Sequence, residues 1–144
     1  MVFRGGPVLA LDLKGRVTVP SRWRDHLMAT VQGKLMITKH PDGCVALYPM
    51  PVWEAFETSV LALPNEQDSW RRFYMGSATE VEIDSGSRVL IPPELRAWAF
   101  LDKEVKFMGM GAHFEIWDPV RHEARETVSI AQGRPETLRN MVVR

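Results

Sequence analysis

The chain has little cysteine: Cys44 is the only one among its 144 residues. No disulfide can form within the chain, and no cluster of thiolates around zinc can be built from one copy, so a reducing compartment is expected. No apolar run approaches the roughly 20 residues that a membrane-spanning helix needs, and residues 1–6 contain no continuous hydrophobic segment typical of a signal peptide. We therefore expect a cytoplasmic protein without a membrane partner.

The chain also lacks an excess of either charge, because its 18 basic residues balance its 18 acidic ones. This balance argues against a broadly basic surface of the kind that binds nucleic acid. The distribution along the chain is uneven, however, since residues 1–24 hold five basic side chains against Asp12 alone, a local charge of +4. The basic residues of this segment are Arg4, Lys14, Arg16, Arg22 and Arg24.

An internal repeat organises the sequence. Residues 12–24 align with residues 84–96 at a constant offset of 72, and residues 45–48 align with residues 114–117 at an offset of 69. Hydrophobic residues make up 45% of the chain, enough for a folded domain. A half of about 40 residues cannot bury enough apolar surface alone, whereas two halves facing one another can close a common barrel. We therefore predict one fold made from two halves.

Each copy is predicted to form a strand, a polar turn, a short strand, a helix that follows proline, and a hairpin. In the first copy these are strands at 8–11 and 17–19, a helix at 21–28, and strands at 35–38 and 45–48. Ser21 is the expected cap of the helix, with Trp23 and Leu27 on its buried face, and Leu95 and Ala99 repeat that spacing. The hairpin turn is placed at residues 41–43, and at 109–111 in the second copy.

Four segments follow from this pattern: a first half-module at 7–53, a helical connector at 54–78, a second half-module at 79–122, and a helical or frayed tail at 123–144. The connector carries an aromatic and apolar stripe that packs either between subunits or within one, and the sequence leaves both open. Its members are Trp53, Phe56, Val60, Trp70 and Phe73.

Three motifs, in this order and spacing, resemble the MraZ family over roughly residues 3–118. They are Phe3-Arg4-Gly5, Asp12-x-Lys14-Gly15-Arg16-Val17-x-Val19-Pro20, and Phe114-Glu115-Ile116-Trp117-Asp118. The resemblance implies a mainly β fold with helices (α+β), in which two SpoVT-AbrB-type halves form a swapped-hairpin β-barrel. It also implies a ring-shaped homo-oligomer, associated with the nucleoid, that represses the division and cell-wall gene cluster by binding repeated promoter elements.

The second copy departs from the motif, because Ser87 stands where the first copy has Gly15 directly before the arginine. We expect Gly86 to supply the flexible position one residue earlier. This departure weakens the equivalence of Arg88 to Arg16.

DNA binding is predicted for residues 12–16, the first loop. Arginine presents two donors in a fixed fork to guanine, lysine adds a charge for phosphate, and Gly15 permits a tight turn close to the backbone of DNA. Arg4, Arg22 and Arg24 are predicted to contact phosphates around it. The plainer interpretation is a hairpin turn in which Asp12 caps backbone amides and both cations are merely solvated.

The second copy has the opposite charge: residues 80–96 hold four acidic side chains against two basic ones, a charge of −2. Because such a surface repels phosphate, we predict that DNA contact is concentrated in the first loop.

No catalytic constellation is evident, so neither an enzyme nor a small-molecule substrate is expected. His26, His40, His113 and His122 lack paired metal-ligand spacing, and Cys44 is expected to be a small buried hydrophobe, so no metal or other cofactor is predicted. The alternative function is an antitoxin-like protein-interaction module, and a nuclease using Asp12 and Lys14 comes third.

Overall fold

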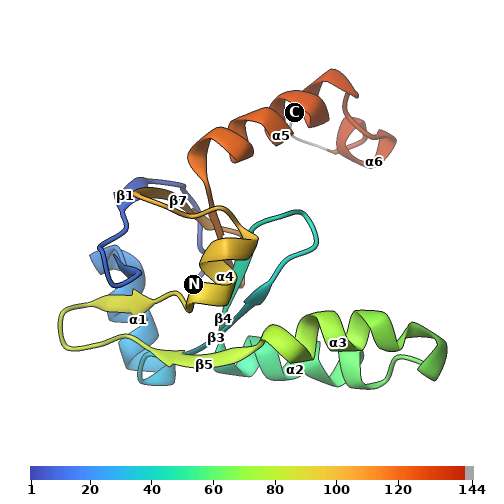
Figure 1. The fold of residues 1–144 in the computed structure, drawn as a ribbon. Helices are drawn as coiled ribbons and strands as arrows, with labels where there is room; N and C mark the ends of the chain where they lie inside the picture. The colour runs from blue at the N-terminus through green and yellow to red at the C-terminus, as the bar shows by residue number, and fades with distance from the viewer. Residues whose placement is uncertain (142–144) are drawn as a thin grey trace.

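The computed structural model describes residues 1–141 (Figure 1), so the last three residues of the predicted tail lie outside the described part. The first copy contributes β1 (Val8–Ala10), β2 (Arg16–Thr18), α1 (Ser21–Val31), β3 (Lys34–Lys39) and β4 (Val45–Pro49). Next come α2 (Met50–Leu61), the short 3₁₀ helix η1 (Asn65–Gln67) and α3 (Asp68–Ser77). The second copy contributes β5 (Thr79–Glu82), β6 (Arg88–Leu90), α4 (Pro93–Trp98), β7 (Glu104–Gly109) and β8 (Phe114–Trp117), and α5 (Pro119–Ala131) and α6 (Glu136–Arg139) follow. The expected α+β fold class is confirmed.

The strands form an antiparallel six-stranded sheet in the order β1-β7-β8-β4-β3-β5, and β2 pairs with β6 in a separate two-stranded ribbon. The first strand of each copy pairs with a strand of the other copy: β1 pairs with β7, and β5 pairs with β3. The order therefore reads the same from either edge when the copies are exchanged. This exchange of strands explains why neither half is a separate sheet.

The prediction of a closed barrel was wrong in one respect. Within residues 1–141 the ladder of the large sheet ends at β1 and β5, because β2 and β6 pair with one another. An isolated bridge between Leu11 and Val17 joins the end of β1 to the ribbon. A pseudo-twofold axis relates the copies. It passes between Val17 and Val89 in the ribbon and between Ala46 and Glu115 in the sheet, since each of these residues faces its own repeat equivalent.

The main core lies between the sheet and the ribbon. Alternation along β4 sends Val45 and Leu47 into it, where they meet fully buried residues from both copies such as Trp23, Phe107 and Phe114. Burying each such large apolar side chain contributes roughly 1.5–3 kcal/mol. Because residues of both copies fill one core, the copies fold as one unit.

A second, smaller cluster lies on the opposite face of the sheet, where α2 and α3 cover β3 and β4. Tyr48 of β4 packs against Trp53 and stacks on Phe56. Trp53 and Val60 are buried within the chain, whereas the Trp70 side chain is 49% exposed. The intramolecular alternative for the aromatic stripe is therefore confirmed for Trp53 and Val60.

The first helix departs from prediction at its start. Pro20 occupies the cap position without a side-chain hydrogen bond to the helix, and Ser21 is already the first helical residue, so the expected serine cap was wrong. The extended backbone of Pro20 carries the chain directly from the ribbon into α1. Trp23 and Leu27 are buried as expected.

The helices outside the core extend away from it. In Figure 1 the α2–α3 hairpin reaches to the right and α5 rises above the sheet. No helix within residues 1–141 has the length and apolarity required to span a membrane.

Candidate nucleic-acid interface

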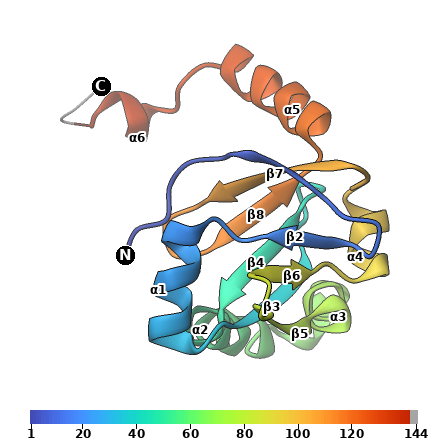
Figure 2. The same cartoon turned by 90° about the vertical axis from the view of Figure 1, so that its left-hand side faces the viewer.

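Two loops lie at opposite ends of the β2–β6 ribbon: residues 12–16, the first loop, and residues 84–88, the second loop. Their positions follow from the antiparallel register, in which Arg16 at the start of β2 faces Leu90 at the end of β6. Figure 2 shows the ribbon facing the viewer, with the first loop on the right beside α4. The ribbon thus holds both loops on one side of the molecule.

Asp12 organises the first loop. Its Oδ1 accepts hydrogen bonds from the backbone N–H of Lys14 at 3.0 Å and of Arg16 at 2.8 Å, and its Oδ2 accepts from Arg16 Nε at 2.8 Å. The N–H of Arg16, followed by its side chain and the N–H of Lys14, lowers the pKa of Asp12 below the ordinary 3.8. The predicted capping role of Asp12 is confirmed.

Asp84 organises the second loop in the same way, accepting from the backbone N–H of Gly86 and of Arg88, each at 2.9 Å. The expectation for Gly86 was wrong. Ser87 itself takes the left-handed backbone with φ +65°, which matches Gly15 with φ +85° in the first loop. The two loops therefore share one geometry despite the glycine-to-serine difference.

Each loop is braced by the helix of the opposite copy. Arg24 of α1 donates to the Ser87 hydroxyl at 2.9 Å, and Arg96 of α4 lies against Gly15 while its Nε donates to the Ile91 carbonyl at 2.9 Å. A Cβ on Gly15 would lie 2.6 Å from that Nε. Gly15 is buried beneath Arg96. The lack of a Cβ at this position leaves the room that the Arg96 side chain occupies.

The outward face of the ribbon carries Arg16, Thr18, Arg88 and Leu90, since these alternate with the fully buried Val17 and Val89. Within residues 1–141 the Arg16 side chain forms its hydrogen bond through Nε, which leaves its two terminal nitrogens available for a ligand. Arg88 is held less tightly, because its Nε lies 3.5 Å from Asp84 Oδ2.

The tip of the first loop presents Leu13 and Lys14 to solvent, and the Leu13 side chain is 104% exposed. Sequence reasoning missed Leu13. The available signal was an apolar residue inside a polar turn, where no core position is expected. An apolar side chain beside Lys14 can contact a thymine methyl or a sugar in a groove.

The remaining predicted cations lie elsewhere. Arg22 donates to the Arg4 carbonyl at 3.2 Å and stacks over the Trp23 ring at 4.9 Å, and Arg24 also pairs with Asp25 at 2.8 Å. Figure 2 shows the start of α1 at the left, across the molecule from the first loop. The structure therefore unites Lys14 and Arg16, places Arg24 at the second loop, and sets Arg4 and Arg22 apart.

Two comparisons with known proteins, one with a family model and one with individual relatives, agree with each other. A family model described as "MraZ protein, putative antitoxin-like" matches the chain twice, over residues 2–75 and 73–142. Proteins named "Transcriptional regulator MraZ" from Cupriavidus taiwanensis and Burkholderia mallei are 50% and 48% identical to it. Each alignment spans 139 residues, 96% of this chain and 98% of the relative.

Proposed function

This chain belongs to the MraZ family, and from that premise we propose that it is a transcriptional regulator that binds double-stranded promoter DNA through the first loop. The observation that carries the proposal is the position of Lys14 and Arg16. Both lie on a loop fixed by the Asp12 carboxylate, at the end of a ribbon whose core-facing residues are fully buried. A rigid support of this kind lowers the entropy that a contact must overcome.

Arg16 is the base-reading residue in this proposal. Its bond to Asp12 through Nε restrains the guanidinium and leaves the two terminal nitrogens as a fork for a ligand. That fork matches O6 and N7 of guanine, a contact worth about 1–3 kcal/mol of discrimination. Lys14 contacts phosphate, and Arg4, Arg22 and Arg24 supply further phosphate contacts outside the first loop.

The second loop contributes less in this proposal. It has the same shape, but it lacks a lysine and follows the exposed Glu80 and Glu82 of β5. These carboxylates repel phosphate, and they offset the charge of Arg88 and of Arg24, which is bonded to Ser87. We assign the second copy chiefly to completing the fold and to assembly.

One loop buries little DNA, so binding by a single chain is weak. We propose a homo-oligomeric ring that presents several first loops to repeated elements, which raises their effective concentration. The proposed target is the promoter of the division and cell-wall gene cluster, with repression as the outcome. Exposed apolar residues on α5, among them Val120 at 74% and Ile130 at 73%, suit contacts between subunits.

A mobility-shift titration at fixed salt tests the proposal, using DNA from upstream of the protein's own gene. Arg16→Ala should weaken binding roughly 5- to 150-fold, the equivalent of 1–3 kcal/mol. Arg88→Ala should weaken it less, and Arg72→Ala, an exposed arginine of α3, is the matched control. Lys14→Ala should reduce the slope of log K against log salt by about one.

Normal binding by Arg16→Ala would refute the assignment of Arg16. A salt slope unchanged by loss of Lys14 or Arg16, but reduced by loss of Arg88, would reverse the roles of the loops. Absence of binding by the wild type would favour the antitoxin-like interaction module, for which a co-purifying toxin would be the sign.

A further inference from the structure

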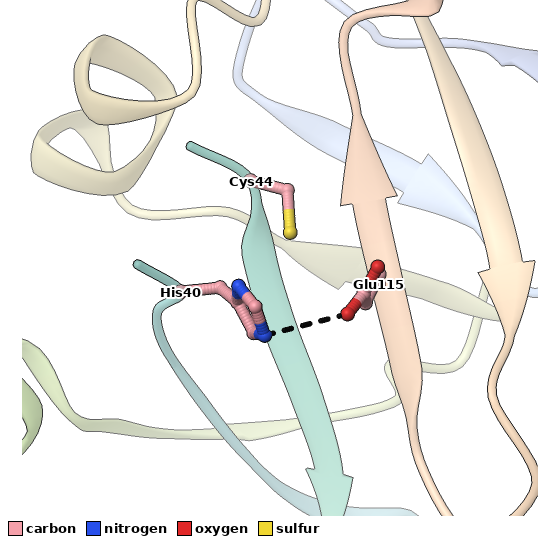
Figure 3. Close-up of side chains that lie close together, drawn as sticks. All are labelled: His40, Cys44 and Glu115. Atoms are coloured by element: carbon pink, nitrogen blue, oxygen red, sulfur yellow. Dashed lines mark ion pairs between the residues drawn. The ribbon is translucent and has the colours of Figure 1, made fainter. Parts of the chain in front are cut away.

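Three side chains of different chemistry meet on the outer face of the sheet, far along the chain from the two loops (Figure 3). Within residues 1–141, His40, Cys44 and Glu115 bring one nitrogen, one sulfur and one oxygen within 4.8 Å of each other. His40 and Cys44 flank the β3–β4 turn of the first copy, and Glu115 lies in β8 of the second. The spacing of the histidines in the sequence gave no sign of this cluster, because its third member comes from the other copy.

Glu115 is an unusual residue for its position. It lies on the pseudo-twofold axis opposite its repeat equivalent Ala46, near the middle of the sheet, and its residue is only 9% exposed. Burying a carboxylate is costly unless it is paired. Trp117 Nε1 donates to its Oε1 at 2.9 Å, and Oε2 lies 3.5 Å from His40 Nε2. Its second oxygen therefore faces the imidazole and the buried thiol.

We propose that His40 Nε2, Cys44 Sγ and a Glu115 carboxylate oxygen bind one divalent ion of the zinc type. Thiolate, imidazole and carboxylate are the ligands that zinc takes, and three of them leave one position for water. Bond lengths of about 2.0–2.3 Å in a tetrahedron place ligand atoms roughly 3.3–3.8 Å apart. The nitrogen-to-oxygen separation of 3.5 Å already lies in that range. The three ligand atoms all lie within 4.8 Å of one another, so movement of the Cys44 side chain toward the other two would close the tetrahedron.

The surroundings suit a bound ion. In the metal-free chain His40 Nδ1 accepts a hydrogen bond from the Asp42 backbone N–H at 3.0 Å. Binding an ion through Nε2 puts the imidazole proton on Nδ1, which replaces that bond by an interaction with the Asp42 carboxylate, whose Oδ2 lies 3.9 Å away. That carboxylate is held by Arg125 of α5 at 2.9 Å, and a closer approach of the imidazole would complete a carboxylate–histidine–metal arrangement. A pocket of about 270 Å³ between the sheet and α5 is lined by Glu115, Trp117 and Arg125, so the Glu115 side of the cluster is open to solvent.

The metal-free chain keeps the thiol protonated, since burial first, and Glu115 second, raise the pKa of Cys44. An incoming ion must displace this proton, and its charge then compensates both the thiolate and the carboxylate. The bound ion would join the first copy to the second at the axis that relates them. It would therefore stabilise the folded chain as a whole.

Titration of the metal-stripped full-length chain with Co²⁺ tests the proposal. Because Cys44 is the only cysteine, a thiolate-to-cobalt charge-transfer band can arise from no other residue. We expect the band to saturate at one ion per chain and to disappear when Zn²⁺ displaces the cobalt. Zinc at about 100 times its dissociation constant should raise the Tm by about 5–10 °C.

Glu115→Gln keeps an oxygen for Trp117 and should weaken cobalt binding more than about 100-fold, beyond the usual loss for an outer-shell partner. Cys44→Ala should abolish the band. Glu54→Gln, an exposed carboxyl of α2, is the matched control. Should Cys44→Ala fail to fold, His40→Asn on the partly exposed turn decides in its place. No band in the wild type, or a band that persists unchanged in Glu115→Gln, would overturn the site.

Discussion

Replacing Gly15 by alanine tests whether the shape of the first loop depends on the arginine brace. Gly15 has φ +85°, a backbone that residues with a Cβ rarely adopt, and the new Cβ would lie 2.6 Å from Arg96 Nε. The Arg96 side chain can move away only by giving up its hydrogen bond to the Ile91 carbonyl. The substitution therefore combines backbone strain with the loss of one partly buried hydrogen bond.

The expected loss of stability is about 2 kcal/mol. Left-handed backbone costs roughly 1–2 kcal/mol for a residue with a Cβ, partly offset by about 0.4–1 kcal/mol because alanine restricts the unfolded chain. The lost Arg96 bond adds about 1 kcal/mol. At roughly 2–4 °C per kcal/mol for a chain of this size, the Tm should fall by about 4–8 °C.

Two other glycines separate the contributions. Gly111 has φ +88° with nothing within 4 Å of an added Cβ, so Gly111→Ala should show the backbone strain alone, about 1 kcal/mol. Gly76 in α3 has equally open surroundings and no positive φ, so Gly76→Ala should stabilise the chain by up to about 1 kcal/mol. Thermal unfolding followed by tryptophan fluorescence measures all three. The reasoning fails if Gly15→Ala costs no more than Gly111→Ala.

Three further outcomes are expected. Arg16→Lys should weaken promoter binding by about 1–3 kcal/mol with an unchanged salt slope, because the charge stays and the fork is lost; equal affinity in a mobility-shift assay would contradict this. Asp12→Asn should be less stable than wild type at neutral pH. Since the pKa of Asp12 is lowered on folding, the difference in stability between the two proteins should begin to shrink as the pH falls through 3.8. Urea titrations that show a constant difference would refute this prediction. Thr38→Val should lower the free energy of unfolding by about 1–3 kcal/mol and speed amide exchange in α3. The reason is that Thr38 Oγ1 bonds to the Tyr74 carbonyl and the Ser77 hydroxyl, each at 2.9 Å. Unchanged exchange would show that these bonds do not anchor α3.

Much of the fold was predictable because its signals are local. Alternating apolar residues and turn sequences predicted the hairpin of β3 and β4, and the spacing of Trp23 and Leu27 predicted the buried face of α1. The helix cap was missed because Ser21 and Pro20 both suit a helix start, and the backbone direction out of β2 decides between them. Whether the chain closes a barrel depended on the partner that β2 chooses, a contact between distant segments.

The candidate DNA-binding loop was predictable for the same reason, since the hydrogen bonds that Lys14 and Arg16 donate to Asp12 lie within five residues. The side chains that brace the loop were not predictable. Arg96 comes from the other copy, and it reaches Gly15 only because the antiparallel β2–β6 ribbon sets the end of one copy's helix beside the other copy's loop. Likewise, local spacing could not show that Ser87 takes the left-handed backbone.

The sequence by itself determined the duplication, the α+β class, the asymmetry of charge and the turns in which an aspartate caps its own loop, because each depends on residues near one another in the chain. Only the tertiary structure decided the exchange of edge strands, the pairing of β2 with β6 and the meeting of His40 and Cys44 with Glu115. Those features join residues tens of positions apart. Their geometry is set by a common core that exists only once both copies have packed together.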